Sequence, residues 1–554
     1  MKKNTIIIVL VVLLTLFLGY IIYLYSINYM NMGNMHGNNS GMGNMHNSTN
    51  NKTTKSELIY GKGQEAVEEK KQEIVNLKDG DNYTIEIVKI KKNIGGKQVE
   101  MLAYNGSIPG PLIKVKEGAK VKLTIVNKVA DLETTLHSHG LRLSDMFDGV
   151  VKDMMGKQDP ILEGDSFTYE LSFPDVGVFW YHPHLREDIQ QELGLYGNYI
   201  VEPTDDNYYS KVNREESIIL DDISLNGNKL KPFYKEFTNY VLMGRFGSTM
   251  FINGNTDYVF NMKKGEVVRV YLTDVANTRI FNFKIPGVKM KLVGSDIGKY
   301  EKETFIDNIV ISPGERYIVD LYAPDFGTFE IQNSTPDNNY VLGKVLVSNE
   351  NIDISYKSNF ETLNVNTDII KDIDNYRKYF DKKVDKNLSL ELGNLGKKGG
   401  ITDDQMGNMN MGHGMMGDNS NQDIEWDDNM LMMNQLSTSL NYEWKIIDKD
   451  TKKENMDINW QFKKGDIVKI HIENKKDGAH PMQHPFHIHG QRFLVINRDG
   501  KRQENLVWKD TVLLKTGENI DILVDMSNPG EWMSHCHISE HLFSGMMMHF
   551  SVKE

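Results

Sequence analysis

The sequence has one cysteine, Cys536, among 554 residues. A single thiol cannot build an internal disulfide framework, so this cysteine needs another role. Basic residues are too few to balance the acidic ones, which leaves a formal net charge of −13 and a pI near 5.7. Because phosphate contacts require a basic face, we expect no nucleic-acid partner.

Long stretches of helical periodicity are also scarce. Instead, strict alternation of apolar and polar residues follows a glycine turn three times, which is typical of half-buried strands. The copies are Val121–Ile125 after Gly118, Val268–Leu272 after Gly265 and Val468–Ile472 after Gly465. About 60 residues further on, a Pro/Gly turn enters an aromatic strand each time, at 174–179, 324–329 and 529–532. We therefore predict three homologous all-β domains, each an antiparallel sandwich or Greek-key barrel.

Chain length agrees with this repeat, because 554 residues require roughly three or four domains. The predicted boundaries are a signal anchor or signal peptide at 1–28, a mobile linker rich in Met, Asn and Gly at 29–75, β-domains at 76–204, 205–350 and 429–554, and a linker with a Met-rich loop at 351–428.

The N-terminus predicts the compartment. Lys2 and Lys3 precede an apolar, charge-free run from Thr5 to about Ile27, and about 20 apolar residues span a bilayer. Because the positive end stays in the cytoplasm, we expect an extracytoplasmic protein that is held to the membrane by an uncleaved anchor. The alternative is a cleaved signal peptide and a secreted protein, although no Ala-x-Ala cleavage site is evident.

Histidine is concentrated in four His-x-His pairs, two in the first third of the chain and two near its end. The pairs are His137 and His139, His182 and His184, His487 and His489, and His535 and His537. Imidazole suits copper, zinc and iron, whereas thiolate selects copper, zinc or iron–sulfur. The pairs and Cys536 together predict a multi-metal redox site.

The segment around Cys536 refines this prediction. On a strand, His535 and His537 would face one way and Cys536 the other, so one strand would serve two metal sites. A His/Cys/His centre with a distant thioether, here His484, Cys536, His541 and Met546, fits a blue-copper site. Zinc is the alternative metal, but a structural zinc ion is bound by four ligands and does not account for ten histidines. We interpret His471, His480 and His549 as surface or satisfied core residues.

With these motifs in order, the chain resembles a three-domain multicopper oxidase of the laccase and cuprous-oxidase type over about residues 80–554. The resemblance implies three tandem cupredoxin-like Greek-key β-sandwich domains and four copper ions. It implies type 1 copper on His484, Cys536, His541 and axial Met546, type 2 copper on His137 and His487, and a type 3 pair on His139, His182 and His537 and on His184, His489 and His535. The middle domain has no histidine, as the resemblance leads us to expect.

The resemblance also implies the reaction. A small reducing substrate would give single electrons to the type 1 site, and O₂ would be reduced to water at the trinuclear cluster. Asp148 holds the position of the family's proton-delivering acid, although Asp148-Gly149 is also an ordinary turn signal. Leu542 stands where many bacterial relatives have a glutamate, which puts the second proton path in doubt and leaves Glu187 and Asp188 as substitutes.

Methionine gives the one indication of the electron donor. The chain has 29 methionines, many of them in 29–55, in 397–421 and at Met430, Met432 and Met433. Low apolar bulk and many glycines predict mobile segments at 29–55 and 397–421. We favour a tether for the first, and for the second a plain interdomain loop and a Cu(I)-binding loop stay open, since thioether suits Cu(I).

We expect Cu(I) as the donor, in copper tolerance. The alternatives are a laccase-like phenol oxidase, an Fe(II) or Mn(II) oxidase and a copper-sequestering envelope protein without enzyme activity. If the methionines only fill gaps and flexible linkers, they do not indicate the electron donor. Intact ligands at every position disfavour the non-enzymatic alternative. The sequence does not determine the oligomeric state.

Overall fold

The computed structural model describes residues 56–394, 423–476 and 480–554, which belong to a compact unit of residues 55–554. The predicted anchor and the two predicted mobile Met-rich segments at 29–55 and 397–421 lie outside the described residues. Among the helices of the described part of the chain, none is long and apolar enough to cross a membrane.

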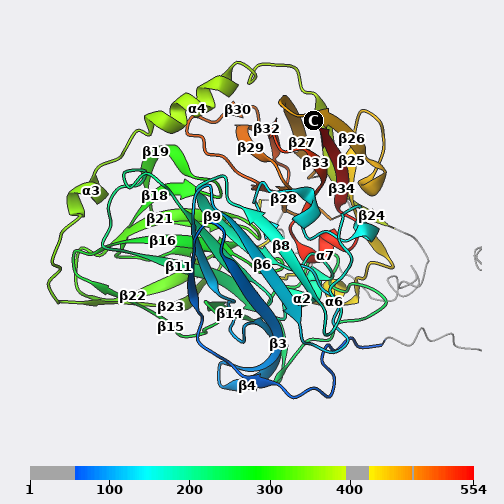
Figure 1. Cartoon of the computed structure of the whole chain (residues 1–554), viewed down its shortest axis with the longest axis horizontal. Helices are drawn as coiled ribbons and strands as arrows, with labels where there is room; N and C mark the ends of the chain where they lie inside the picture. Colours follow the sequence, from blue (N-terminus) through cyan, green and yellow to red (C-terminus); the bar gives the residue numbers. More distant parts are fainter. Residues whose placement is uncertain (1–55, 395–422, 477–479) are drawn as a thin grey trace, which may run out of the picture. The chain divides into compact units, whose positions relative to one another are not determined.

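Three pairs of β-sheets follow one another along the chain (Figure 1). The first pair has β3 and β6 in one sheet and β5 and β10 in the other, and apolar side chains such as Leu123 and Tyr199 from both sheets share one core. Its strands are β1 (Val67–Glu68), β2 (Ile74–Leu77), β3 (Asn82–Ile94), β4 (Lys97–Tyr104), β5 (Leu112–Lys116), β6 (Lys120–Asn127), β7 (His137–His139), β8 (Ser166–Ser172), β9 (Gly177–His182) and β10 (Gly197–Glu202).

The second pair of sheets has the strand orders β14-β11-β16-β21-β18-β19 and β15-β23-β22-β17-β20 and encloses a core of its own. Its strands are β11 (Arg214–Ile223), β14 (Thr249–Ile252), β15 (Tyr258–Lys263), β16 (Val267–Asp274), β17 (Phe281–Lys284), β18 (Lys289–Ser295), β19 (Lys299–Ile306), β20 (Ile309–Ile311), β21 (Arg316–Tyr322), β22 (Gly327–Ser334) and β23 (Asn339–Ser348), with β12 (Leu225–Asn226) and β13 (Lys229–Leu230) as a separate hairpin.

The third pair has the orders β25-β24-β27-β32-β29-β30 and β26-β34-β33-β28-β31. Its strands are β24 (Lys386–Asn394), β25 (Tyr442–Asp448), β26 (Asn459–Lys463), β27 (Asp466–Asn474), β28 (His484–Ile488), β29 (Arg492–Arg498), β30 (Lys501–Arg502), β31 (Thr511–Leu514), β32 (Asn519–Met526), β33 (Gly530–Cys536) and β34 (Met547–Lys553). Cys536 lies in the core of this pair, together with Met546 and Met548.

The three copies of the sequence repeat occupy equivalent places in these sheets. The alternating segments form β6, β16 and β27, each between a parallel and an antiparallel neighbour. The glycine before each of them has φ between +81° and +89°, a conformation that favours glycine. The aromatic segments form β9, β22 and β33, each paired with the strand that follows it.

Strand β16 differs from the prediction of a half-buried strand, because all eight of its residues are buried. Its second face is covered by the first pair of sheets, where Asn198 donates a hydrogen bond to Thr273 at 2.9 Å and Tyr271 packs with Val178 and Ile200. Alternation in the sequence therefore indicates the strand but does not reveal that another domain covers its polar face.

The predicted domain boundaries need two corrections. Strand β24 falls in the predicted linker 351–428, but it pairs with β25 and β27 and thus belongs to the third pair of sheets. In the predicted linker 29–75, β1 and the start of β2 pair with β3 and β5. All three strands join a sheet by backbone pairing, which a search for a repeated side-chain pattern does not detect.

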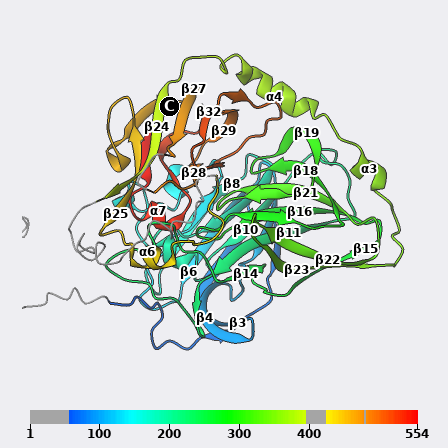
Figure 2. The same ribbon diagram turned by 180° about the vertical axis from the view of Figure 1, so that it is seen from behind.

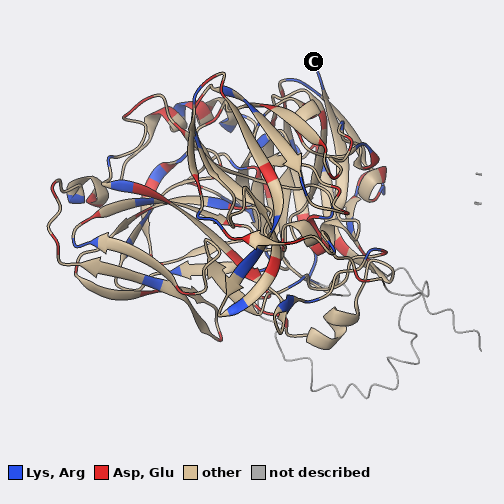
Figure 3. Cartoon of the chain, turned by 60° about the horizontal axis from the view of Figure 1, so that its bottom comes forward, with Lys and Arg blue, Asp and Glu red and all other residues tan. Residues whose placement is uncertain are grey.

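Within residues 56–394, 423–476 and 480–554, helices are few and short. They are α2 (Glu187–Gln190), α3 (Lys357–Glu361), α4 (Thr367–Arg377), α6 (Leu431–Leu436) and α7 (Ser539–Leu542), with 3₁₀ turns η1 (Asp145–Phe147), η2 (Lys152–Met154) and η3 (Asn455–Asp457). Helices α3 and α4 connect the second pair of sheets to the third (Figures 1 and 2). Acidic and basic residues both occur throughout the described strands and loops (Figure 3).

Candidate metal centre

Three buried side chains of the third pair of sheets form the first candidate site. Strand β28 begins at His484, β33 ends at Cys536, and α7 brings the chain back at His541. The Cys536 Sγ lies 3.5 Å from His484 Nδ1 and 3.8 Å from His541 Nδ1, and the two nitrogens are 3.3 Å apart. Burial raises the pKa of the Cys536 thiol, so a thiolate at this place requires a cation beside it.

Met546 stands close to this group. Its side chain is fully buried in the core that holds Cys536, and its carbonyl accepts a hydrogen bond from the Cys536 amide at 3.1 Å. The Trp444 ring covers the two histidines, with its centroid 4.3 Å from that of His541 and 4.8 Å from that of His484. We call His484, Cys536 and His541 the Cys536 site.

The eight histidines of the His-x-His pairs form a second candidate site. They are His137, His139, His182, His184, His487, His489, His535 and His537, all at most 2% exposed. Strand pairing sets His137 opposite His182 and His487 opposite His535. We call these eight rings the imidazole centre.

The two halves of the chain meet ring against ring in the imidazole centre. The centroids of His139 and His487 are 3.8 Å apart, and those of His137 and His489 are 4.1 Å apart. The Nε2 atom of His535 lies 3.0 Å from that of His489 and 3.4 Å from that of His184. Residues from the first and third pairs of sheets therefore contribute jointly to the imidazole centre.

One nitrogen of most of these rings is held by an oxygen. The Nδ1 atoms of His137, His182, His487 and His535 lie 2.7–2.9 Å from the carbonyl oxygens of Asp148, Pro183, Asp510 and Cys536. A ring nitrogen that donates to a carbonyl carries the proton, which leaves the other nitrogen as a lone pair. Such outer contacts fix the rings of metal-binding histidines.

The remaining nitrogens fit metal ions. Nε2 of His137, His182 and His487 and Nδ1 of His139 are buried without a hydrogen-bond partner among the described residues. Burial lowers the pKa of His489 to about 3, so the ring is neutral at neutral pH. Its Nδ1 donates its one proton to Asp148, which leaves a lone pair on Nε2, 3.0 Å from Nε2 of His535. Converging imidazole lone pairs beside a His/Cys/His set suit copper, among the metals that these ligands bind.

Models of known protein families show to which family the chain belongs. Multicopper oxidase models match residues 86–206, 207–348 and 423–554. The chain belongs to the multicopper oxidase family. It is therefore an oxidoreductase of a copper-binding, O₂-using family, and the predicted all-β fold of three cupredoxin-like domains is confirmed.

Relatives of this multicopper oxidase differ in their described activities. A multicopper oxidase of Staphylococcus aureus is 28% identical over 488 residues, which cover 85% of this chain and 89% of the relative. An iron transport multicopper oxidase of Gibberella zeae is 26% identical and covers 81% of this chain and 72% of the relative. A solved multicopper oxidase of Campylobacter jejuni, described as a metallo-oxidase, has a TM-score of 0.63 at 24% identity, with 91% of this chain and 98% of that chain covered.

Two of the predicted ligand sets of this multicopper oxidase lie together in the structure as close groups. Predicted sets that recur as close groups are His484 with Cys536 and His541, and His184 with His489 and His535. The set His139, His182 and His537 has ring centroids 4.9–5.8 Å apart, whereas the ligand atoms of His139 and His182 lie within 4.8 Å of one another and of His137. The rings predicted for type 2 copper, His137 and His487, lie 5.9 Å apart.

The predicted acids have different surroundings. Asp148 is 5% exposed and accepts a hydrogen bond from His489 Nδ1 at 2.9 Å. Glu187 is fully buried with its Oε2 3.3 Å from His182 Nδ1, whereas Asp188 is paired with Arg186. Leu542 is fully buried on α7.

The sequence motifs did not reveal two residues beside the imidazole centre, Asp510 and Arg316. Asp510 accepts a hydrogen bond from His139 Nε2 at 3.0 Å, and Arg316 of the second pair of sheets pairs with Asp510. Neither residue belongs to a motif, so their contacts became visible only in the fold. His480, which we interpreted as a surface or satisfied core residue, is half-buried, and its Nε2 atom has no hydrogen-bond partner among the described residues.

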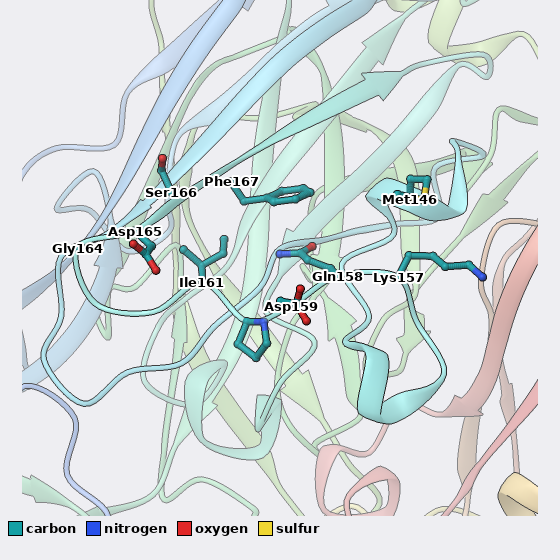
Figure 4. Close-up of a pocket in the computed structure, with 10 residues that line it drawn as sticks. Met146, Lys157, Gln158, Asp159, Ile161, Gly164, Asp165, Ser166 and Phe167 are labelled. Atoms are coloured by element: carbon teal, nitrogen blue, oxygen red, sulfur yellow. The ribbon is translucent and has the colours of Figure 1, made fainter. Parts of the chain in front are cut away.

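A surface pocket of about 460 Å³ lies apart from both sites. It is lined by Met146, Gln158, Asp159 and Phe167, among others, and none of its lining residues is a predicted ligand (Figure 4).

Proposed function

We propose that this multicopper oxidase couples the one-electron oxidation of a reducing substrate at the Cys536 site to the four-electron reduction of O₂ to water at the imidazole centre. The observation that carries this proposal is the placement of His535, Cys536 and His537. Cys536 faces His484 and His541, while His535 faces His184 and His489. One short stretch of backbone thus joins the two sites.

Four copper ions are proposed for these sites. The Cys536 site, together with Met546, would hold type 1 copper. His137 and His487 would hold type 2 copper, and the other six rings would hold the type 3 pair. When bound, copper supplies the single-electron and O₂ chemistry, which amino-acid side chains lack.

Asp148 is proposed to deliver protons, because each O₂ takes up four protons with its four electrons. It is the carboxylate that touches His489, and η1, which ends beside it, places it at the edge of the imidazole centre. Glu187, the buried carboxyl beside His182, is the candidate for the second proton path that Leu542 lacks.

Cu(I) is the proposed donor. Helix α6 supports this proposal, because Met430 before it and Met433 within it pack against the core that holds Cys536. Thioethers suit Cu(I), and Met432 is 66% exposed to solvent on the same helix.

His480 gives a second argument for a metal donor. It lies close enough to His484 to contribute to that ring's lowered pKa, of which burial is the larger cause. Burial also lowers the pKa of His480 to about 4, so its ring is neutral at physiological pH and one of its two nitrogens has a lone pair for a metal ion. Copper, iron and other metal ions accept such a ligand.

Two other activities are kept as candidates. A laccase from Fomitopsis schrenkii is 24% identical over 490 residues, which favours a phenol as the donor. The iron transport and metallo-oxidase descriptions of other relatives favour Fe(II) or another metal ion. A copper-sequestering envelope protein would not need the imidazole centre. We also propose an extracytoplasmic location, with residues 1–28 as anchor or signal peptide, on the charge-free run and the two lysines before it.

Donor-driven O₂ uptake tests these candidates. The full chain is supplied in turn with Cu(I), a phenol, Fe(II) and Mn(II), and kcat/KM is compared. Cu(I) should rank first, and His480→Leu should lower kcat/KM for Cu(I) while leaving that for the phenol unchanged. A phenol ranked first would contradict Cu(I) as the donor, and an equal loss for both donors in the variant would contradict the role of His480.

A further inference from the structure

The middle pair of sheets contributes no histidine, yet one of its side chains reaches the imidazole centre. Arg316, at the start of β21, is fully buried. Its Nη1 and Nη2 donate to the two carboxylate oxygens of Asp510 at 2.6 and 2.5 Å. Its Nε donates to the Val178 carbonyl at 2.8 Å. A single guanidinium therefore contacts the first and third pairs of sheets from the second.

Asp510 transmits this contact to two rings of the imidazole centre. Its Oδ1 lies 3.0 Å from His139 Nε2, and its carbonyl oxygen lies 2.9 Å from His487 Nδ1. These two rings are stacked, with their centroids 3.8 Å apart. Because Asp510 holds His139 at Nε2, the lone pair of that ring is left on Nδ1, which has no hydrogen-bond partner among the described residues.

Close packing leaves this arrangement little freedom. Asp296 accepts hydrogen bonds from the Arg316 amide at 2.9 Å and from the Asp510 amide at 3.3 Å. A β-carbon on Gly140 would lie 2.4 Å from Asp510 Oδ2, and one on Gly314 would lie 2.8 Å from His537 Cδ2. The backbone of the first and second pairs of sheets thus approaches Asp510 and the imidazole centre as closely as glycine permits.

We propose that Arg316 is a positioning residue for the imidazole centre. Its bidentate pair fixes the Asp510 carboxylate, and Asp510 in turn fixes the orientation and tautomer of His139 and the position of His487. The middle domain thereby controls copper binding at the centre without supplying a ligand. This inference rests on the proposed copper function, and it concerns the imidazole centre but not the Cys536 site.

The chain contains a matched control for this proposal. Arg269 pairs with Asp320 at 2.9 and 3.0 Å, and both side chains are buried. This pair lies entirely within the second pair of sheets, between β16 and β21. Loss of a buried bidentate pair should destabilise the fold in both cases, but only the Arg316 pair touches the imidazole centre.

The test compares Arg316→Met, Arg316→Lys and Arg269→Met in the full chain loaded with copper. Three quantities are measured: copper affinity by titration, the type 2 copper EPR spectrum, and the blue absorption of the Cys536 site. Arg316→Met should weaken copper binding at the imidazole centre by about 10- to 100-fold and alter the type 2 spectrum, as losses of outer contacts do. Its blue absorption per folded chain should remain.

The other two variants sharpen the test. Arg316→Lys should give a smaller change, because lysine keeps the charge but not the bidentate fork, and it serves alone if Arg316→Met does not fold. Arg269→Met should keep the type 2 spectrum of the unchanged chain. An unaltered type 2 spectrum in both Arg316 variants, or the same alteration in Arg269→Met, would overturn the proposal. Failure of the unchanged chain to bind copper with blue and type 2 signals would instead contradict the proposed function.

Discussion

The Cys536 site and the imidazole centre are built in different ways, although one strand end serves both. All three residues of the Cys536 site lie within residues 484–541, inside one apolar core. The imidazole centre brings His139 within 4.9 Å of His537, 398 positions later, and the carboxylates Asp148 and Asp510 hold rings of the centre from outside. The first site therefore depends on local folding, whereas the second depends on how the domains dock.

The largest expected effect comes from breaking the link between the two sites. Cys536→Ser replaces a soft thiolate with a hydroxyl that does not bind copper in the same way. We expect loss of the blue absorption and of essentially all donor-driven O₂ uptake, while the type 2 EPR signal of the imidazole centre remains. Absorption, EPR and oxygen-electrode measurements on one preparation check this. Donor-driven uptake that survives the substitution would refute the proposed role of Cys536.

The second largest effect is expected from a substitution that changes only the imidazole centre. Asp148→Asn keeps an oxygen that can accept from His489 but removes the charge and the proton-carrying group. We expect kcat for O₂ uptake to fall by about 10²- to 10⁴-fold, the usual contribution of a positioned acid or base. Anaerobic bleaching of the blue colour by the donor should keep its rate in a stopped-flow experiment.

An unchanged kcat for O₂ uptake in Asp148→Asn would contradict the proposed role of Asp148 in proton delivery. Equal slowing of uptake and of anaerobic bleaching would place the effect at the Cys536 site instead. A suitable control is Asp145→Asn. Asp145 begins η1, whose end Asp148 follows, and it accepts a hydrogen bond from the Glu531 amide at 3.0 Å, with no histidine contact among the described residues.

Weakening the contact between the first and third domains should have a smaller effect, and it should affect the imidazole centre more than the Cys536 site. Asn528 donates to the Leu143 carbonyl at 2.8 Å across the first and third pairs of sheets. Asn528→Ala should cost about 0.5–1.5 kcal/mol of unfolding free energy and loosen copper in the imidazole centre before the Cys536 site. Chelator titration followed by EPR and absorption measures the order of loss. Asn127→Ala, which removes hydrogen bonds to Leu132 and Ile161 within the first domain, should not change that order.

The same contrast explains what the sequence could predict. Strand alternation around Cys536 and the three glycine-led repeats are local patterns, and both were found in the structure at the predicted places. Asp510 and Arg316 lie 194 positions apart and come together only when β21 and β31 dock, so no local spacing reveals them. Strand β24 was missed for a related reason, because its partners β25 and β27 lie beyond a segment of low complexity.

The smallest effect should concern the donor alone and leave both sites intact. Met430 and Met433 pack against the core that holds Cys536, and Met→Leu keeps nearly the same volume at a cost below about 1.5 kcal/mol each. The double variant should therefore keep its blue absorption and type 2 spectrum. If these thioethers receive Cu(I), KM for Cu(I) should rise several-fold while KM for a phenol stays constant. Met262→Leu, a buried methionine in the core of the middle domain, is the control for loss of a thioether as such. An unchanged KM for Cu(I) in the double variant would show that α6 only fills space beside the Cys536 site, and the donor preference would then have to come from His480 or from residues outside the described part of the chain.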